Sequence, residues 1–335
     1  MVAGVIHPIP SGTRDVLPDE MRELRRLSLA LIEVFERFGY GEVSTPTIEY
    51  AEVLARGDGR TAGSAYRLFD EQGELLALRS DMTIPIARLV ASRYGDAERP
   101  IRLCYLANAF RAVRPQRGQM REFAQAGVEL IGAEAPAGTA EVIEVLEAAL
   151  DAAGLTRAVI GLGDADLYRQ LLAEMGIQGE ARESLLARLA THDLVGLEAE
   201  LGRLEGVDDA AVETLIALSQ LRGGSEAIEQ ARALGGEAVA RATARIQGTY
   251  DELRARGAAE RVQIDLGLLR DLGYYSGAIL EVYDPALGHV LGGGGRYDGL
   301  LGRFGLDLPA AGFALYLERL HVAQAEEEKL ERGTP

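Results

Sequence analysis

Two stretches rich in strand-forming residues lie on either side of a long helical block, and this order limits how the chain can fold. Residues 164–256 carry Ala, Leu, Glu and Arg at helical spacing, whereas hairpin-like runs come before and after them. Hairpins with helices segregated to one side are typical of an α+β fold rather than of a doubly wound α/β fold. We therefore expect distant strands to share one mostly antiparallel sheet flanked by helices.

The same order predicts three parts of the chain. Residues 1–163 form the first part of a core, residues 164–256 an inserted helical subdomain, and residues 257–335 the second part of the core. The total of 335 residues is compatible with roughly two domains. A hydrophobic fraction of 47% supplies enough apolar side chains for a core of this size.

Charge and cysteine content narrow the class of protein. The net charge is −17, which argues against a nucleic-acid-binding protein because phosphates are usually neutralised by a basic face. The single cysteine, Cys104, lies in an apolar run and predicts a buried thiol rather than a disulfide. The sequence shows no signal peptide and no apolar run of membrane-spanning length. We expect a cytoplasmic protein with no membrane contact.

The most distinctive short stretch runs from Phe110 to Glu129 and predicts a β-hairpin. Two strand-forming arms meet at a turn over residues 115–118. Strand alternation places on one face of the return arm Arg121, Phe123, Gln125, Gly127 and Glu129. A face with Arg, Gln and Glu suits a sheet that binds a small charged ligand. The alternative is a hairpin with one solvated face, which is common in antiparallel sheets.

Helices are predicted on both sides of this hairpin. One begins at Pro18 and ends before Gly39, with leucines and phenylalanines at helical spacing. Another runs from about Ile84 to Tyr94, and Asp81 precedes it. Asp81 can be the N-cap of this helix or a ligand-binding residue, and its position alone supports both interpretations.

Five stretches in order resemble the catalytic core of class II aminoacyl-tRNA synthetases, and specifically histidyl-tRNA synthetase. Gly39–Glu49 is similar to the first class II motif, which forms a dimer interface, and Phe110–Glu129 to the second, a hairpin that grips ATP. Ala311–Arg319 is similar to the third motif. Arg270–Gly277 and Gly294–Gly299 resemble two stretches that are specific to the histidine enzyme.

This resemblance implies a pocket for histidine. An anionic and polar group for the ammonium, a guanidinium for the carboxylate, and a carboxyl group with two phenols for the imidazole match the ligand in charge and hydrogen bonding. The implied ammonium residues are Asp81, Thr83 and Gln125; the imidazole residues are Glu129, Tyr275 and Tyr297; the carboxylate residue is Arg270.

The positions that hold ATP in the synthetases are altered in this chain. Val113 stands where the family has a glutamate for the adenine amine, and Gln119 where it has an arginine. Tyr316 replaces a glycine on the adenine floor. Three arginines remain as possible anion-binding residues, namely Arg111, Arg121 and Arg319. We expect no adenylation chemistry, no cofactor and no metal site.

The chain ends soon after the third motif, where a synthetase continues into an anticodon-binding domain, so we expect no tRNA partner. A histidine pocket without adenylation chemistry resembles the regulatory subunit of ATP phosphoribosyltransferase. In that family the subunit is catalytically degenerate and pairs with a short catalytic subunit at the first step of histidine biosynthesis. It is needed for activity and takes part in feedback inhibition by histidine. The implied partners are that subunit, a second copy of this chain, and histidine as effector.

Two other functions stay open at this point. A reduced synthetase-like enzyme could adenylate histidine, which ATP–pyrophosphate exchange would detect. A histidine sensor could act on a different partner, which co-purification would identify.

Overall fold

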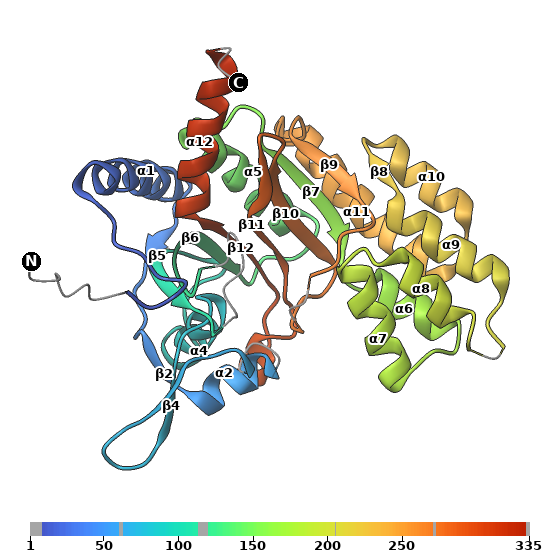
Figure 1. Ribbon diagram of the computed structural model, residues 1–335, viewed down its shortest axis with the longest axis horizontal. Helices are drawn as coiled ribbons and strands as arrows, with labels where there is room; N and C mark the ends of the chain where they lie inside the picture. Colours follow the sequence, from blue (N-terminus) through green and yellow to red (C-terminus); the bar gives the residue numbers. More distant parts are fainter. Residues whose placement is uncertain (1–8, 60–62, 113–119, 205, 271–272, 333–335) are drawn as a thin grey trace, which may run out of the picture.

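A nine-stranded sheet forms the centre of the computed structural model, which describes residues 9–59, 63–112, 120–204, 206–270 and 273–332 (Figure 1). The strand order is β1-β5-β6-β12-β11-β10-β7-β9-β8. The strands are β1 (Gly41–Glu42), β5 (Ile101–Phe110), β6 (Glu122–Ile131), β7 (Val159–Asp164), β8 (Arg222–Gly223), β9 (Val262–Asp265), β10 (Ala278–Asp284), β11 (Leu287–Arg296) and β12 (Ala310–Tyr316).

The sheet is mixed, which corrects the expectation of a mostly antiparallel sheet. The strands from β5 to β7 in the sheet order pair antiparallel, but β1 is parallel to β5 and β7 is parallel to β9. Parallel neighbours need a crossover connection of a dozen or more residues. The whole helical block lies between β7 and β9, and it returns the chain to a position next to β7 in the same direction. Sequence patterns do not reveal strand direction after so long a connection.

Four helices cover one face of the sheet: α1 (Pro18–Arg37), α5 (Ala137–Ala152), α11 (Glu237–Arg256) and α12 (Leu317–Glu331). Helix α1 begins with Pro18 and two acidic residues, as predicted, and buries a stripe of leucines and Phe35. Gly39 has a φ of +80° just after the helix, a conformation that glycine adopts at little cost. Cys104 faces this layer and is fully buried, which raises the pKa of its thiol to about 12.

The opposite face carries a smaller layer. It consists of α2 (Ala51–Gly57), α4 (Thr83–Arg93), the 3-10 helix η1 (Leu301–Phe304) and a three-stranded sheet of β2 (Ile48–Tyr50), β4 (Leu75–Leu78) and β3 (Arg67–Phe69). In this small sheet β3 and β4 pair antiparallel as a hairpin. Alternation along β5 places Leu103 and Tyr105 in this layer's apolar cluster and Cys104 in the other.

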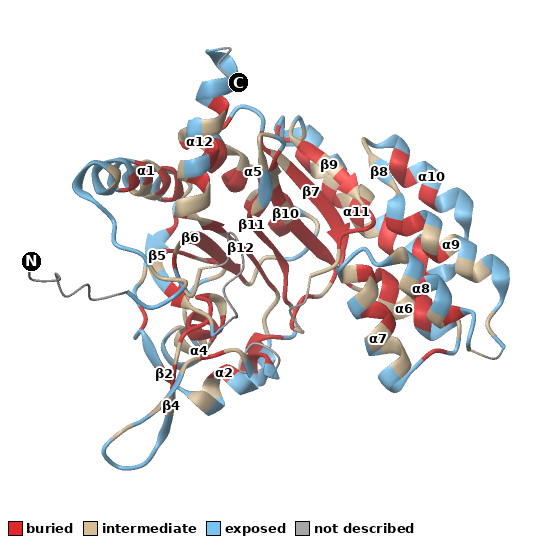
Figure 2. Cartoon of the chain, in the orientation of Figure 1, coloured by how far each residue is buried: buried red, intermediate tan, exposed pale blue. Residues whose placement is uncertain are grey.

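The helical segment α6 to α10 lies to one side of the main sheet (Figure 1). Its helices are α6 (Leu167–Glu174), α7 (Gly179–Ala190), α8 (Leu194–Leu201), α9 (Asp209–Gln220) and α10 (Glu226–Leu234). Buried residues run continuously from the central strands into α11 and these helices (Figure 2). Helix α11 packs against α5, α6 and β7, so it connects the segment to the sheet.

The division of the chain at residues 163 and 257 stays a prediction. Within the described residues, no helix has both the length and the apolar character needed to cross a membrane.

Candidate functional site

A small cavity lies over the central strands, and six of the seven predicted histidine-pocket residues line it. They are Asp81, Thr83, Gln125, Arg270, Tyr275 and Tyr297. Further lining side chains come from residues without a predicted role in the histidine pocket: Tyr105, Arg111, Tyr274, Phe313 and Tyr316. The lining therefore joins segments far apart in the sequence, and it surrounds the cavity with phenols, two guanidinium groups and one carboxyl group.

Two glycines make room for charged side chains beside the cavity. A Cβ atom on Gly293 of β11 would lie 1.5 Å from Nη1 of Arg270, and one on Gly312 of β12 would lie 2.0 Å from Oε2 of Glu129. Neither distance is compatible with a side chain. The glycine-rich run that forms β11 thus allows Arg270 to lie against the sheet, where its Nη1 donates to the carbonyl of Leu280 at 3.1 Å.

Glu129 is the predicted pocket residue that does not line the cavity. Its side chain is buried behind Thr83, which donates a 2.8 Å hydrogen bond to Oε1, and Tyr297, whose hydroxyl donates to Oε2. Burial raises the pKa of Glu129 to about 8, although the bonds from Tyr297 and Thr83 act in the opposite direction. An imidazole can contact Glu129 directly only if Thr83 or Tyr297 moves. Otherwise it interacts with Glu129 indirectly, through the hydroxyl groups of these two residues.

Asp81 lies one residue before Met82, the N-cap of α4, and it contacts both the start of this helix and the cavity. Its Oδ1 accepts a hydrogen bond from the backbone N–H of Ile84 at 3.1 Å, which satisfies a free donor at the start of α4. The same carboxyl group is buried and lines the cavity. Burial raises its pKa, and the N–H of Ile84 and the charge of Arg111 oppose that shift.

Gln125 is buried in the cavity wall with an unsatisfied acceptor. Its Oε1 has no hydrogen-bond partner among the described residues, and its side chain is only 2% exposed. A buried acceptor left unpaired costs about 1–3 kcal/mol. A ligand with an N–H donor would remove this cost, and an amino-acid ammonium is such a donor.

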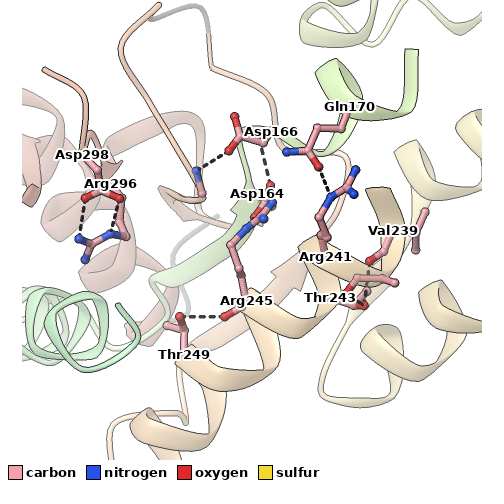
Figure 3. A network of polar contacts seen from close by, with 12 residues as sticks. Asp164, Asp166, Gln170, Val239, Arg241, Thr243, Arg245, Thr249, Arg296 and Asp298 are labelled. Carbon is pink, nitrogen blue, oxygen red and sulfur yellow. Dashed lines mark hydrogen bonds and ion pairs between the residues drawn. The ribbon is translucent and has the colours of Figure 1, made fainter. Parts of the chain in front are cut away.

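The segment that carries Tyr275 is fixed from two sides. Arg245 of α11 forms two hydrogen bonds with Asp164 at 2.7 and 2.8 Å, and Asp166 accepts from the backbone N–H of Gly277 at 3.2 Å (Figure 3). On the other side, Ser276 N donates to the carbonyl of Arg296 at 2.8 Å. The backbone segments that carry Tyr275 and Tyr297 are thereby held next to each other.

Tyr316 occupies the part of the site where the sequence predicted loss of ATP binding. Its ring lies 4.6 Å from the guanidinium of Arg319 and packs edge-on against Phe123. Arg111 lies close enough for its charge to act on the hydroxyl of Tyr316. Burial alone would raise the pKa of Tyr316, but Arg111, Arg270 and Arg319 outweigh it and lower the pKa.

The three predicted anion-binding arginines are not equivalent. Arg111 lines the cavity, Arg319 stacks on Tyr316 outside the lining, and the backbone N–H of Arg121 donates to the carbonyl of Gly12 at 2.7 Å. They do not form one cluster around the cavity. Val113 and Gln119 lie outside the described residues.

The cavity holds only about 30 Å³. That is room for about two water molecules, and an amino acid needs several times this space. Any histidine bound here must displace side chains from the positions they now occupy. The side chains that could be displaced include those of Tyr316, Thr83 and Tyr274, because each lines the cavity.

Sequence reasoning assigned no pocket role to Tyr105 and Tyr274. Both are buried in the apolar cluster that lies under the cavity. Alternation along β5 places Tyr105 on the same face as Leu103, but nothing in the sequence shows that β5 passes beneath the cavity. Tyr274 adjoins Tyr275, and the pair of aromatic residues was the available signal.

Comparisons with known proteins identify related sequences and structures. The histidyl-tRNA synthetase family matches residues 12–320. The ATP phosphoribosyltransferase regulatory subunits of Moorella thermoacetica and Symbiobacterium thermophilum are both 44% identical to this chain, over 95% and 96% of it and 82% and 81% of the relatives. A solved structure of an ATP phosphoribosyltransferase regulatory subunit/histidyl-tRNA synthetase from Bacillus halodurans matches with a TM-score of 0.86 at 36% identity, covering 95% of this chain and 83% of that one.

Proposed function

Because this chain belongs to the histidyl-tRNA synthetase family and, within it, to the regulatory subunits of ATP phosphoribosyltransferase, we propose that it binds histidine and regulates a catalytic subunit. It acts in histidine biosynthesis. In this proposal the chain is not itself an enzyme: a short catalytic phosphoribosyltransferase subunit requires it for activity, and histidine acts through it as a feedback inhibitor. The chain forms a dimer, works in the cytoplasm and has no tRNA partner.

The unpaired acceptor of Gln125 is the observation that supports histidine binding most directly. It is buried in the wall of the cavity that Asp81 and Arg270 also line. A ligand with an ammonium and a carboxylate would supply the missing donor and the counter-ion together. Tyr275 and Tyr297, with Glu129 behind Tyr297, then provide hydroxyl and carboxyl groups for an imidazole.

Tyr316 supports a non-catalytic role. Its ring and hydroxyl engage two of the arginines expected to face phosphates in a synthetase, Arg319 and Arg111. ATP binding would require it to leave both. We expect no histidine-dependent ATP–pyrophosphate exchange by the purified chain, and detectable exchange would favour the reduced-synthetase alternative.

Calorimetric titration with L-histidine and histamine tests the pocket. Histamine lacks the carboxylate, so the native chain should bind histidine at least about tenfold more tightly, as expected for a charge-assisted hydrogen bond. Arg270→Met should abolish this preference while leaving histamine affinity nearly unchanged. Gln125→Leu should weaken both ligands about tenfold, because it removes an ammonium partner that they share.

Arg232→Met is the matched control, since Arg232 lies exposed on α10 away from the cavity. It should leave both affinities unchanged. Native affinities in both Gln125→Leu and Arg270→Met would show that histidine binds elsewhere. Regulation itself is measured by the rate of the short catalytic subunit with and without this chain, each in the presence and absence of histidine.

A further inference from the structure

A second and much larger cavity lies between the helical segment and the core. Its volume is about 500 Å³, within the range of small-molecule sites. We call it the α6–α7 cavity, and it is bounded by Arg169, Glu183, Leu186, Ala187, Ala190 and Arg270, with Thr191 and Leu269 beside them. It is distinct from the small cavity over the sheet, but Arg270 lines both.

Two arginines in this lining, Arg169 and Arg270, have N–H donors that can bind a ligand. Arg169 donates to the carbonyl of Tyr275 at 3.5 Å, and Arg270 donates to that of Leu280 at 3.1 Å. Among the described residues, neither forms an ion pair with a carboxylate. A guanidinium has five N–H donors, so most donors of both arginines remain for a ligand, and they match a phosphate or carboxylate group.

The rest of the lining limits what such an anion can be. Leu186, Ala187 and Ala190 of α7 present an apolar surface. Glu183 of the same helix is paired with Arg182 at 3.3 Å and adds negative charge to the cavity. A ligand with one anionic head and an apolar body fits this distribution, whereas a second anionic group near Glu183 would be repelled.

We propose that the α6–α7 cavity binds a small organic anion with a phosphate or carboxylate head, and that the ligand is coupled to the amino-acid pocket through Arg270. An anion that draws Arg270 toward the α6–α7 cavity removes positive charge from the smaller one. Gly293 and the carbonyl of Leu280 define the position that Arg270 would leave. The coupling part of this proposal rests on the proposed function, because it requires histidine to bind the smaller cavity.

Calorimetric titration of the full chain with phenyl phosphate, benzoate and inorganic phosphate tests the site. We expect phenyl phosphate or benzoate to bind, and inorganic phosphate to bind at least tenfold more weakly because it lacks the apolar body. Arg169→Gln removes one guanidinium. Ala187→Glu places a carboxylate on the lining at an exposed helical position where folding is not at risk. Each variant should weaken phenyl phosphate or benzoate at least tenfold, and Arg232→Gln, on the distant helix α10, should not.

Coupling is measured by titrating histidine in the presence of the saturating aromatic anion. Histidine affinity should change at least threefold in the native chain and not at all in Ala187→Glu. Native anion affinity in both cavity variants, equal binding of inorganic phosphate, or no aromatic-anion binding at all would overturn the proposed site. Anion binding with no effect on histidine would overturn the coupling. A chain that binds the anion but not histidine would instead overturn the proposed function and leave the second site standing.

Discussion

At the scale of single residues, Glu129 connects the site to pH. Its pKa is about 8 in the folded protein, against an ordinary value of 4.5, chiefly because it is buried. Between these values the unfolded chain has lost a proton that the folded protein keeps, so the stability that the group contributes falls as pH rises. That contribution is complete below pH 4.5 and is lost as pH passes through about 8.

We therefore expect Glu129→Gln to flatten the pH dependence of stability. In urea unfolding followed from pH 5 to pH 8, the native chain should lose up to about 1.4 kcal/mol per pH unit relative to the variant. Glu122→Gln, the same change at an exposed position of the same strand, should follow the native chain. Parallel curves for the native chain and Glu129→Gln would show that Glu129 is ionised in the folded protein.

Gly293 gives a second prediction at this scale. An alanine Cβ there would meet Nη1 of Arg270 at 1.5 Å and the carbonyl oxygen of Leu280 at 2.6 Å. Gly293→Ala should therefore lower the free energy of unfolding by at least about 1–3 kcal/mol, as overpacking does, and should weaken histidine binding by displacing Arg270. Gly299→Ala is the control, because no atom lies within 4 Å of its Cβ position. Equal stability of the two variants would contradict the close contact with Arg270.

At the scale of secondary-structure elements, one ion pair ties α11 to the central sheet. The side chain of Asp164, at the end of β7, is fully buried and forms two hydrogen bonds with Arg245. Arg245→Met leaves the carboxylate without its counter-ion, which costs up to about 3–5 kcal/mol for a buried pair. The double variant Asp164→Asn/Arg245→Met should recover part of this loss, since it leaves no buried charge.

Arg241→Met on the same helix is the control for this element. Arg241 pairs with Glu174 and Glu237 at the surface, where ion pairs contribute about 0–1 kcal/mol. Urea unfolding should therefore separate the two arginine variants clearly, and similar losses in both would mean that Asp164 is reached by water.

Arg245→Met should also weaken histidine binding, because Asp164 lies next to the segment that holds Gly277 and Tyr275.

Elements whose signals are local were predictable from the sequence. The Pro18 helix, the β3–β4 hairpin and the two arms β5 and β6 each have their turn residues and periodicity within a short window. The direction of β9 depends instead on how more than ninety residues cross over, roughly the length of the 164–256 block. Local sequence patterns contain no information on the direction in which a strand re-enters the sheet.

The candidate site was predictable only as a set of residues. The resemblance to histidyl-tRNA synthetase implied pocket roles for Asp81, Gln125 and Arg270, and all three line one cavity. It could not reveal that Gly312 lets Glu129 withdraw behind Thr83, because that contact depends on the register between β6 and β12. The small size of the cavity is likewise a result of side-chain packing, which a motif does not specify.

At the scale of the whole molecule, one apolar surface is left partly exposed by the residues that the structure describes. The outer face of the small sheet consists of Ile48, Tyr50, Leu68, Leu76 and Leu78, since cross-strand partners share a face. Ile48 is 45% exposed and Tyr50 is 52% exposed. On the other face, Glu49 is buried and paired with Arg88 of α4 at 2.7 Å. A contiguous exposed apolar patch of this kind is typical of a protein–protein interface.

We predict that this outer face is the centre of the proposed dimer, and that Tyr50→Glu disrupts it. A C2 dimer brings the same patch together from both chains, so one substitution places two carboxylates in the interface. Sedimentation velocity at micromolar concentration should show a dimer for the native chain and a monomer for Tyr50→Glu. Thermal unfolding followed by circular dichroism at low concentration, where both chains are monomeric, should give the same stability for the two. Val195→Glu is the matched control: Val195 is 80% exposed on α8, apart from the small sheet, so the dimer should persist. A native dimer that Tyr50→Glu leaves intact would place the interface on another surface, and the exposed Met21 and Leu29 of α1 would be the next positions to substitute.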